Sequence, residues 1–190
     1  MKKAREKKCS VCDALDPDHL SEAVEKLETI ASGEQFYAHY FFKRCPACGK
    51  HYFYSWEFYP YGPGNTDESL YLLSPEQVRV LKRFLNPPND TGDFGYYVDQ
   101  VGHLLSYDAG PWPIVTAFLY SFTSSNKDTA AAAYASLVDF VSEKKEYAVE
   151  VLKMITNTPD NEPWRPGQIH KNHPLAKKLV KKCKEIIKKR

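Results

Sequence analysis

Two Cys-x-x-Cys pairs are the residues of this chain whose types and spacing indicate chemistry. Cys9 and Cys12 form the first pair, and Cys45 and Cys48 form the second. Each pair spans a tight turn, so both of its sulfurs can converge on one ion, and four thiolates are the ligand set of a closed tetrahedral zinc site. Such a site leaves no position for water, which makes it structural and not catalytic. The sequence therefore predicts one structural zinc ion per chain, held by these four cysteines.

Two other interpretations of the cysteines stay open at this point, a redox pair and ordinary buried thiols. A thioredoxin-like motif needs one pair in a strand–helix context, whereas this chain has two pairs in predicted turns. Gly49 follows the second pair, where positive φ lets the turn direct backbone N–H groups at sulfur. Asp13 holds the equivalent place after the first pair and tolerates that conformation less well. Cys183 lies in the apolar stripe of a predicted helix, so we expect it to be a small core residue.

The 32 residues between Cys12 and Cys45 predict folded structure of their own, because the usual insert is about 15–20 residues. Apolar residues recur there at helical spacing: Leu20, Val24, Leu27 and Ile30. Gly33 stands where a helix C-cap belongs. We therefore expect a helix to be inserted between the two cysteine pairs.

Aromatic residues on both sides of the second cysteine pair predict strands. The first expected strand covers Phe36 to Phe42, and a third one covers Ser69 to Leu73. The strand between them has one aromatic face: Tyr52, Tyr54, Trp56 and Phe58. We expect this face to pack on the helices of residues 74–155, which need a partner surface.

The knuckle Cys45-Pro46-Ala47-Cys48-Gly49, between two predicted strands, resembles that of the zinc-ribbon group. The resemblance covers Cys9 to about Leu73, little over a third of the chain, and the first knuckle departs from the simplest pattern. Proteins of this group generally bind proteins or nucleic acids, or use the metal only to stabilise a fold. Because structural zinc contributes folding free energy, we expect chelation or Cys45→Ser to unfold residues 9–73.

The second half of the chain predicts helices. Ser74-Pro75-Glu76-Gln77 is a capping box with proline at the first helical position, and its helix runs to about Leu85. Residues 129–156 form one helix or two that meet near Glu143. The predicted fold is α+β: a three-stranded zinc ribbon with an inserted helix (residues 1–73) packed on a helical region (74–157). A Pro-rich loop (158–174) then leads to a basic amphipathic helix (175–190).

The net charge of +2 is unevenly distributed. Residues 1–170 are net acidic, whereas residues 171–190 carry nine Lys or Arg and one Glu, a net charge of +8. Eight of these cations fall on the terminal helix and could contact phosphates: Lys177, Lys178, Lys181, Lys182, Lys184, Lys188, Lys189 and Arg190. The alternative is a docked helix whose cations are solvated. No stretch approaches the ~20 apolar residues of a membrane span, and we expect a cytoplasmic protein.

No catalytic motif supports enzyme activity, since the chain has no phosphate-binding glycine loop and no nucleophile elbow. The leading hypothesis is a non-enzymatic, intracellular zinc-binding protein that binds another macromolecule, with a protein partner slightly favoured. Tyr61 and Trp112, in proline-flanked positions, are the candidate partner contacts. Nucleic-acid binding through the terminal helix, assisted by the ribbon, is the second hypothesis, and an enzyme whose site is assembled from distant residues is the third. Partner identity and oligomeric state have no sequence signal.

Overall fold

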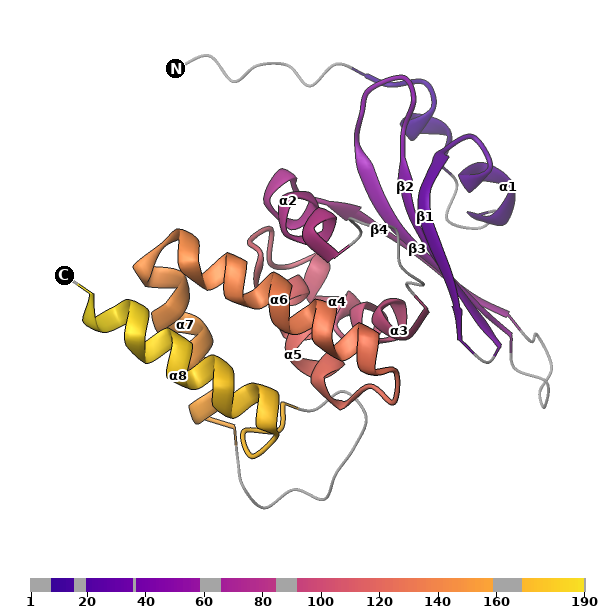
Figure 1. Cartoon of the computed structure of the whole chain (residues 1–190). Coiled ribbons are helices and arrows are strands. Elements are labelled where there is room, and N and C mark those ends of the chain that lie inside the picture. The colour runs from indigo at the N-terminus through magenta and orange to yellow at the C-terminus, as the bar shows by residue number, and fades with distance from the viewer. Residues whose placement is uncertain are drawn as a thin grey trace, which may run out of the picture.

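The computed structural model describes residues 8–15, 20–35, 37–58, 66–84, 92–158 and 169–189. A four-stranded sheet carries a layer of helices on one face and a short N-terminal segment on the other (Figure 1). The strands are β1 (Glu28–Gln35), β2 (Ala38–Arg44), β3 (His51–Phe58) and β4 (Thr66–Leu73). The helices are η1 (Cys12–Ala14), α1 (Leu20–Val24), α2 (Pro75–Phe84), α3 (Gly92–Gln100), α4 (Gly102–Leu105), α5 (Trp112–Tyr120), η3 (Ser121–Thr123), α6 (Lys127–Glu143), α7 (Lys145–Thr156) and α8 (Pro174–Lys188). The α+β class is confirmed.

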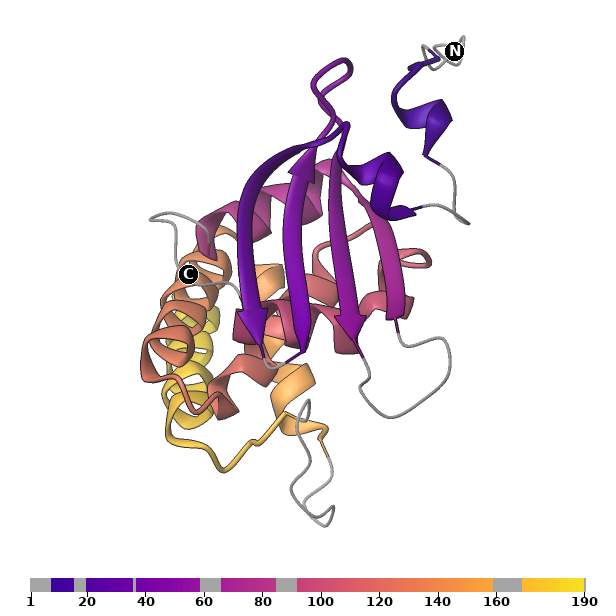
Figure 2. The same ribbon diagram turned by 90° about the vertical axis from the view of Figure 1, so that its right-hand side faces the viewer.

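The sheet is an antiparallel meander in the order β1-β2-β3-β4 (Figure 2). The expected three-stranded ribbon is therefore wrong in its number of strands. The strand it missed is β1, which occupies the second half of the helix expected across Leu20 to Gly33. Helix α1 ends at Val24, and Gly33 lies opposite Tyr40 of β2. The helical spacing led to a wrong prediction here, because Ile30 is 43 % exposed and so does not continue the buried face of a helix. Pairing with β2 outweighs the local pattern.

Both faces of the sheet are apolar, and each packs against a different partner. Tyr40, Phe42 and Phe53 belong to the main core, which they share with the helices. Tyr52 and Tyr54 point to the opposite face and pack in a smaller cluster with the N-terminal segment. The expectation that the Tyr52 face packs on the helices is therefore wrong. Because β3 presents aromatic residues on both faces, alternation along this strand could not tell the two faces apart.

The capping box of α2 is confirmed. The Ser74 hydroxyl oxygen accepts a hydrogen bond from the Gln77 backbone N–H at 3.2 Å, and the Gln77 side-chain oxygen accepts one from the Ser74 backbone N–H at 2.8 Å. The Gln77 amide also donates to the Asp108 carbonyl at 2.8 Å, and its side chain is fully buried. This cap therefore ties the start of α2 to the segment that follows α4.

The long C-terminal helical stretch is divided in two. Lys144 has extended backbone angles (φ −143°, ψ 139°) and separates α6 from α7. Helix α8 docks on both of them, burying Ala176, Leu179 and Cys183 (Figure 1). The expected apolar stripe and the core position of Cys183 are confirmed, and burial raises the pKa of this thiol to about 11.

Helix α3 docks on the inner face of the sheet through a small residue and a carboxylate. A Cβ at Gly95 would lie 2.4 Å from Cβ and Cγ of Tyr40, so only glycine allows this approach. Nearby, the Ser55 hydroxyl donates to the Asp99 carboxylate at 3.1 Å. Burial, followed by the Glu57 carboxylate, raises the pKa of Asp99 to about 6. The interface thus holds a carboxyl group whose charge is disfavoured by its surroundings.

Asp99→Asn is expected to make the protein more stable at pH 7, by about 1–2 kcal/mol after allowance for solvent screening. The folded-state pKa of Asp99 is above that of an aspartate in an unfolded chain. The folded protein therefore holds this proton in the window where the unfolded chain has lost it, and stability falls as the pH rises from about 4 to 6. Urea unfolding of both proteins at pH 4, 5, 6 and 7 would check this. An equal pH slope in the two proteins would contradict it.

Candidate metal centre

The four predicted cysteines meet at one end of the sheet. Cys9 and Cys12 lie at the start of the described chain, and Cys45 and Cys48 lie in the connection between β2 and β3. The Cys9 and Cys45 sulfurs are 3.7 Å apart, those of Cys12 and Cys48 are 3.4 Å apart, and all four lie within 4.8 Å of one another. Tetrahedral zinc with Zn–S bonds of about 2.3 Å needs sulfurs about 3.8 Å apart, whereas a disulfide needs about 2.05 Å. The cluster has the spacing of a metal site and not of a disulfide.

The two knuckles reach this arrangement with different backbones. In the second, Gly49 takes a φ of 75°, its N–H donates to the Cys45 carbonyl at 2.9 Å, and the Cys45 N–H donates to the Lys50 carbonyl at 2.8 Å. The expected positive φ at Gly49 is confirmed. The first knuckle instead continues into η1, and the Asp13 N–H donates to the Cys9 carbonyl at 2.8 Å. A short 3-10 turn therefore replaces the glycine conformation after the first pair.

The thiols differ in how readily they lose a proton. The backbone N–H of Cys12 is the main influence that lowers the pKa of Cys9, to about 7. Desolvation raises the pKa of Cys12 to about 12. The Lys50 N–H acts to lower the pKa of Cys48, but desolvation and the neighbouring thiols outweigh it and the pKa is raised. Four thiols packed this closely resist becoming four thiolates by themselves, and a divalent cation among them removes that resistance.

The cysteine cluster is continuous with an apolar cluster on the outer face of the sheet. Cys9 and Cys45 are buried, and they pack with Val24, Tyr52 and Tyr54. Cys48 is exposed. The site therefore joins three pieces that are distant in sequence: the N-terminal segment, α1 and the β2–β3 connection.

The cations that flank the cysteines in sequence do not all face them. Arg44 forms an ion pair with Glu28 of β1, with 2.6 Å between nitrogen and oxygen. The Lys43 amine donates to the Thr29 hydroxyl at 3.0 Å and lies over the Phe41 ring. Both side chains thus turn toward β1 and away from β3. These contacts direct neither cation at the four sulfurs.

The other residues singled out by sequence lie elsewhere. Trp112 is half-buried and packs edge-on against Phe140 and Tyr147. Tyr61 and Arg190 lie outside the described residues. The terminal-helix lysines from Lys177 to Lys189 are exposed, except for the half-buried Lys182. Figure 1 places α8 on the opposite side of the helical layer from the N-terminal segment, so these cations and the cysteines do not share one surface.

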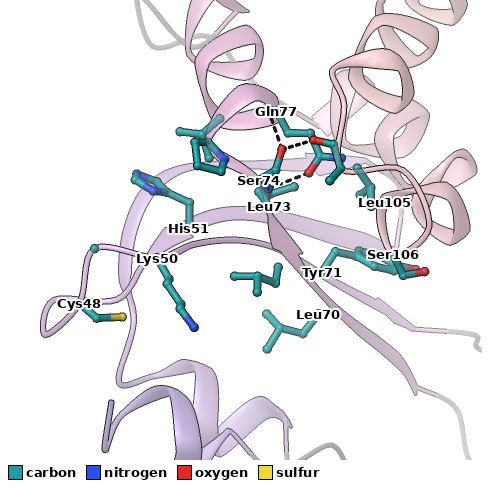
Figure 3. Close-up of a pocket in the computed structure, with 15 residues that line it drawn as sticks. Cys48, Lys50, His51, Leu70, Tyr71, Leu73, Ser74, Gln77, Leu105 and Ser106 are labelled. Carbon is teal, nitrogen blue, oxygen red and sulfur yellow. Dashed lines mark hydrogen bonds between the residues drawn. The ribbon is translucent and has the colours of Figure 1, made fainter. Parts of the chain in front are cut away.

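A cavity beside the second knuckle was not expected from the sequence. Its volume is about 860 Å³, and it lies between the Cys48–His51 segment, the end of β4 and the starts of α2 and the segment after α4 (Figure 3). The only signal was the run Leu70-Tyr71-Leu72-Leu73, which lacks the alternation of a strand with one solvated face.

Comparisons of the chain with protein-family models, with curated proteins and with solved structures gave no match. Within the part of the chain that the structure describes, no helix has the length and apolar character needed to cross a membrane. The cysteine cluster is also the only group of three or more potential metal-ligating side chains among these described residues. The function is therefore inferred from the geometry of the cysteine cluster.

Proposed function

We propose that Cys9, Cys12, Cys45 and Cys48 bind one structural zinc ion. The observation that carries this proposal is the convergence of four sulfurs from two segments 36 residues apart to within 4.8 Å of one another. Zinc is the metal that best fits four thiolates in a closed tetrahedral shell. The ion would fasten the N-terminal segment to the β2–β3 connection, and its role is to hold the fold.

The zinc-stabilised fold then acts as a non-enzymatic binding protein whose partner is a protein. The cavity beside the knuckle supports binding and not catalysis, because its central polar groups already serve the α2 cap. The Ser74 hydroxyl donates to the Ala109 carbonyl, and the Gln77 amide donates to the Asp108 carbonyl. The acidic balance of residues 1–170 also favours a protein partner over nucleic acid.

The purified protein is expected to contain one zinc ion per chain, measured by mass spectrometry of the metal together with amino-acid analysis. Cys45→Ser is expected to lose the zinc, because three thiolates and a hydroxyl bind zinc less tightly than four thiolates. Cys183→Ala is the matched control, since Cys183 lies in the core far from the cluster in sequence. Equal zinc content in Cys45→Ser and the wild type would rule out the proposed ligand set.

Nucleic-acid binding through α8 is the second candidate function, supported by the row of exposed lysines on that helix. The outer aromatic face of the sheet does not add to it: Tyr54 hydrogen-bonds Glu68, and Glu25 lines the hollow next to Trp56, so carboxylates lie where phosphates would pass. In this alternative α8 would act without the zinc module.

Fluorescence anisotropy with labelled single- and double-stranded nucleic acids, titrated with salt, separates the two functions. If protein binding is the main function, no binding is expected at physiological salt. Binding that falls steeply with salt, and that disappears in a Lys177→Gln, Lys181→Gln, Lys184→Gln variant, would establish the second function instead. The variant is expected to fold normally because all three side chains are exposed.

A further inference from the structure

One row of side chains crosses the outer face of the sheet, the face that carries the N-terminal segment. In the strand register, Glu34 of β1 lies opposite His39 of β2, and Trp56 of β3 lies between His39 and Glu68 of β4. Side chains that lie opposite one another on antiparallel strands share a face, with Cβ atoms about 5 Å apart. We call these four residues the outer row. Two aromatic rings form its middle, and a carboxylate stands at each end.

The outer row lies beside a hollow of about 360 Å³. Ser21, Val24 and Glu25 line the hollow from the side of α1, and His39 and Trp56 line it from the sheet. Figure 2 shows α1 over one end of this face, with no other element of the described chain over the rest of it. The His39 and Trp56 rings are half-buried, and their centroids are 5.3 Å apart. The hollow therefore gives access to aromatic ring surfaces.

Carboxylates determine the sign of the charge around the outer row. Among the described residues that line the hollow, Lys43 is the only lysine or arginine. Its amine donates to the Thr29 hydroxyl at 3.0 Å, and the Glu25 carboxylate is close enough to interact with its charge. Lys43 and Glu25 thus offset each other, which leaves Glu34 and Glu68 to set the sign. The proposed metal centre packs against the same face, and its four thiolates outweigh the charge of one divalent ion.

An aromatic ring beside carboxylates is complementary to an arginine side chain. A guanidinium is attracted to the face of an aromatic ring, most strongly to that of tryptophan. It is planar and weakly hydrated, and it can donate two parallel N–H groups to one carboxylate. A lysine ammonium cannot lie flat on a ring in this way. An apolar side chain would take water from the carboxylates without replacing its hydrogen bonds.

We propose that the outer row binds an arginine side chain of the partner protein. The guanidinium lies on the Trp56 ring and donates to the Glu68 carboxylate, and Glu34 adds to the attraction. The inference rests on the proposed function, in which the partner is a protein, and it identifies the chemistry that this partner presents.

A second copy of the chain fits the outer row less well than a different protein does. The basic helix α8 contains lysines but no arginine. Figure 1 also places α8 and the outer face on opposite sides of the molecule. A contact between α8 of one copy and the outer row of the next is therefore head-to-tail, and such contacts form open chains unless the rotation closes a ring. Both observations favour an unlike partner.

The test is an NMR titration of the zinc-loaded full-length protein with a Gly–Ser peptide that carries arginine. The same peptide with citrulline or with lysine in place of arginine is titrated in parallel. Citrulline keeps nearly the shape of arginine but has no charge, so we expect the citrulline peptide to bind about tenfold more weakly or worse. The lysine peptide is expected to bind about threefold more weakly. The arginine peptide should shift the indole signal of Trp56 and leave that of Trp112 unchanged.

Variants locate the site, with affinity measured from backbone amide shifts. Trp56→Leu is expected to weaken binding of the arginine peptide by about tenfold, because it removes the ring and changes no charge. The double variant Glu34→Gln, Glu68→Gln is expected to weaken it by about fivefold. Tyr107→Leu and Glu146→Gln are the matched controls and should bind as the wild type does. They replace an exposed aromatic residue and an exposed carboxylate that lie outside the lining of the hollow.

Three outcomes would overturn the inference: equal binding of the arginine and citrulline peptides, shifts only at residues away from the outer row, or unchanged binding by Trp56→Leu. Concentration-dependent assembly in the ultracentrifuge that is lost in the Lys177→Gln, Lys181→Gln, Lys184→Gln variant would assign the outer row to a second copy instead. Zinc content is measured on each variant. Zinc-loaded protein that does not bind the arginine peptide would refute this inference alone, whereas protein that binds the peptide but takes up no zinc would refute the metal site alone.

Discussion

Removing the metal by chelation, or replacing Cys45 by serine, is expected to lower the Tm by about 8–16 °C. A ligand that binds only the folded state adds about 4 kcal/mol of stability when its free concentration is about 1,000 times its Kd. For a chain of this size, each 1 kcal/mol corresponds to about 2–4 °C. Thermal unfolding followed by circular dichroism, with and without chelator, measures the shift. Cys183→Ala should keep the same response to chelator as the wild type.

Because the main core also holds the sheet, we expect loss of the metal to destabilise a smaller region than residues 9–73. The sequence alone predicted unfolding of residues 9–73, but the inner face of the sheet belongs to the main core through Tyr40 and Phe53. These contacts do not depend on the cysteines. We therefore expect faster hydrogen exchange in residues 8–15, 20–27 and 45–50, and unchanged exchange in α5. Unchanged exchange at the N-terminal segment after complete metal removal would refute the fastening role of the ion.

Gly95→Ala is expected to destabilise the protein by about 3 kcal/mol, the upper part of the usual range for overpacking. The new methyl group would lie 2.4 Å from Cβ and Cγ of Tyr40. These atoms lie next to the β2 backbone and cannot rotate away, so α3 must shift off the sheet. Equilibrium urea unfolding, followed by circular dichroism, gives the change in free energy.

Gly102→Ala is the matched control for this steric argument. A Cβ at Gly102 would lie 2.6 Å from the hydroxyl oxygen of Tyr71, which is the far end of a flexible side chain. Tyr71 can turn aside at small cost, so we expect a loss of about 1 kcal/mol or less. If the two substitutions cost the same, close packing of α3 on Tyr40 is not what limits this interface.

Features that depend on short sequence spacing were readable before the structure. The two Cys-x-x-Cys pairs, the positive φ of Gly49 and the reciprocal cap between Ser74 and Gln77 each follow from residues a few positions apart. The same holds for the buried stripe of α8. In each case the chemistry of the residues leaves few alternatives, so tertiary contacts had little to add.

Features that depend on strand pairing were not readable. The apolar spacing from Leu20 to Ile30 is compatible with a helix, and only pairing with β2 makes Glu28–Gln35 a strand. On β3, Phe53 and Tyr54 are both aromatic, and what covers each face decides which of them meets the helices. The cavity beside the second knuckle is likewise lined by segments far apart in the sequence, from Cys48 to Ala109. These facts arise from the order of strands in space, which one strand's sequence does not encode.

One zinc ion bound by Cys9, Cys12, Cys45 and Cys48 is what holds the N-terminal segment to the β2–β3 connection in our proposal. X-ray absorption at the zinc edge of the purified protein tests it most directly, because the spectrum reports the type, number and distance of the ligands. We expect four sulfur atoms at about 2.3 Å and no nitrogen or oxygen in the shell. A shell that contains nitrogen or oxygen, or a purified protein that takes up no zinc, would contradict it.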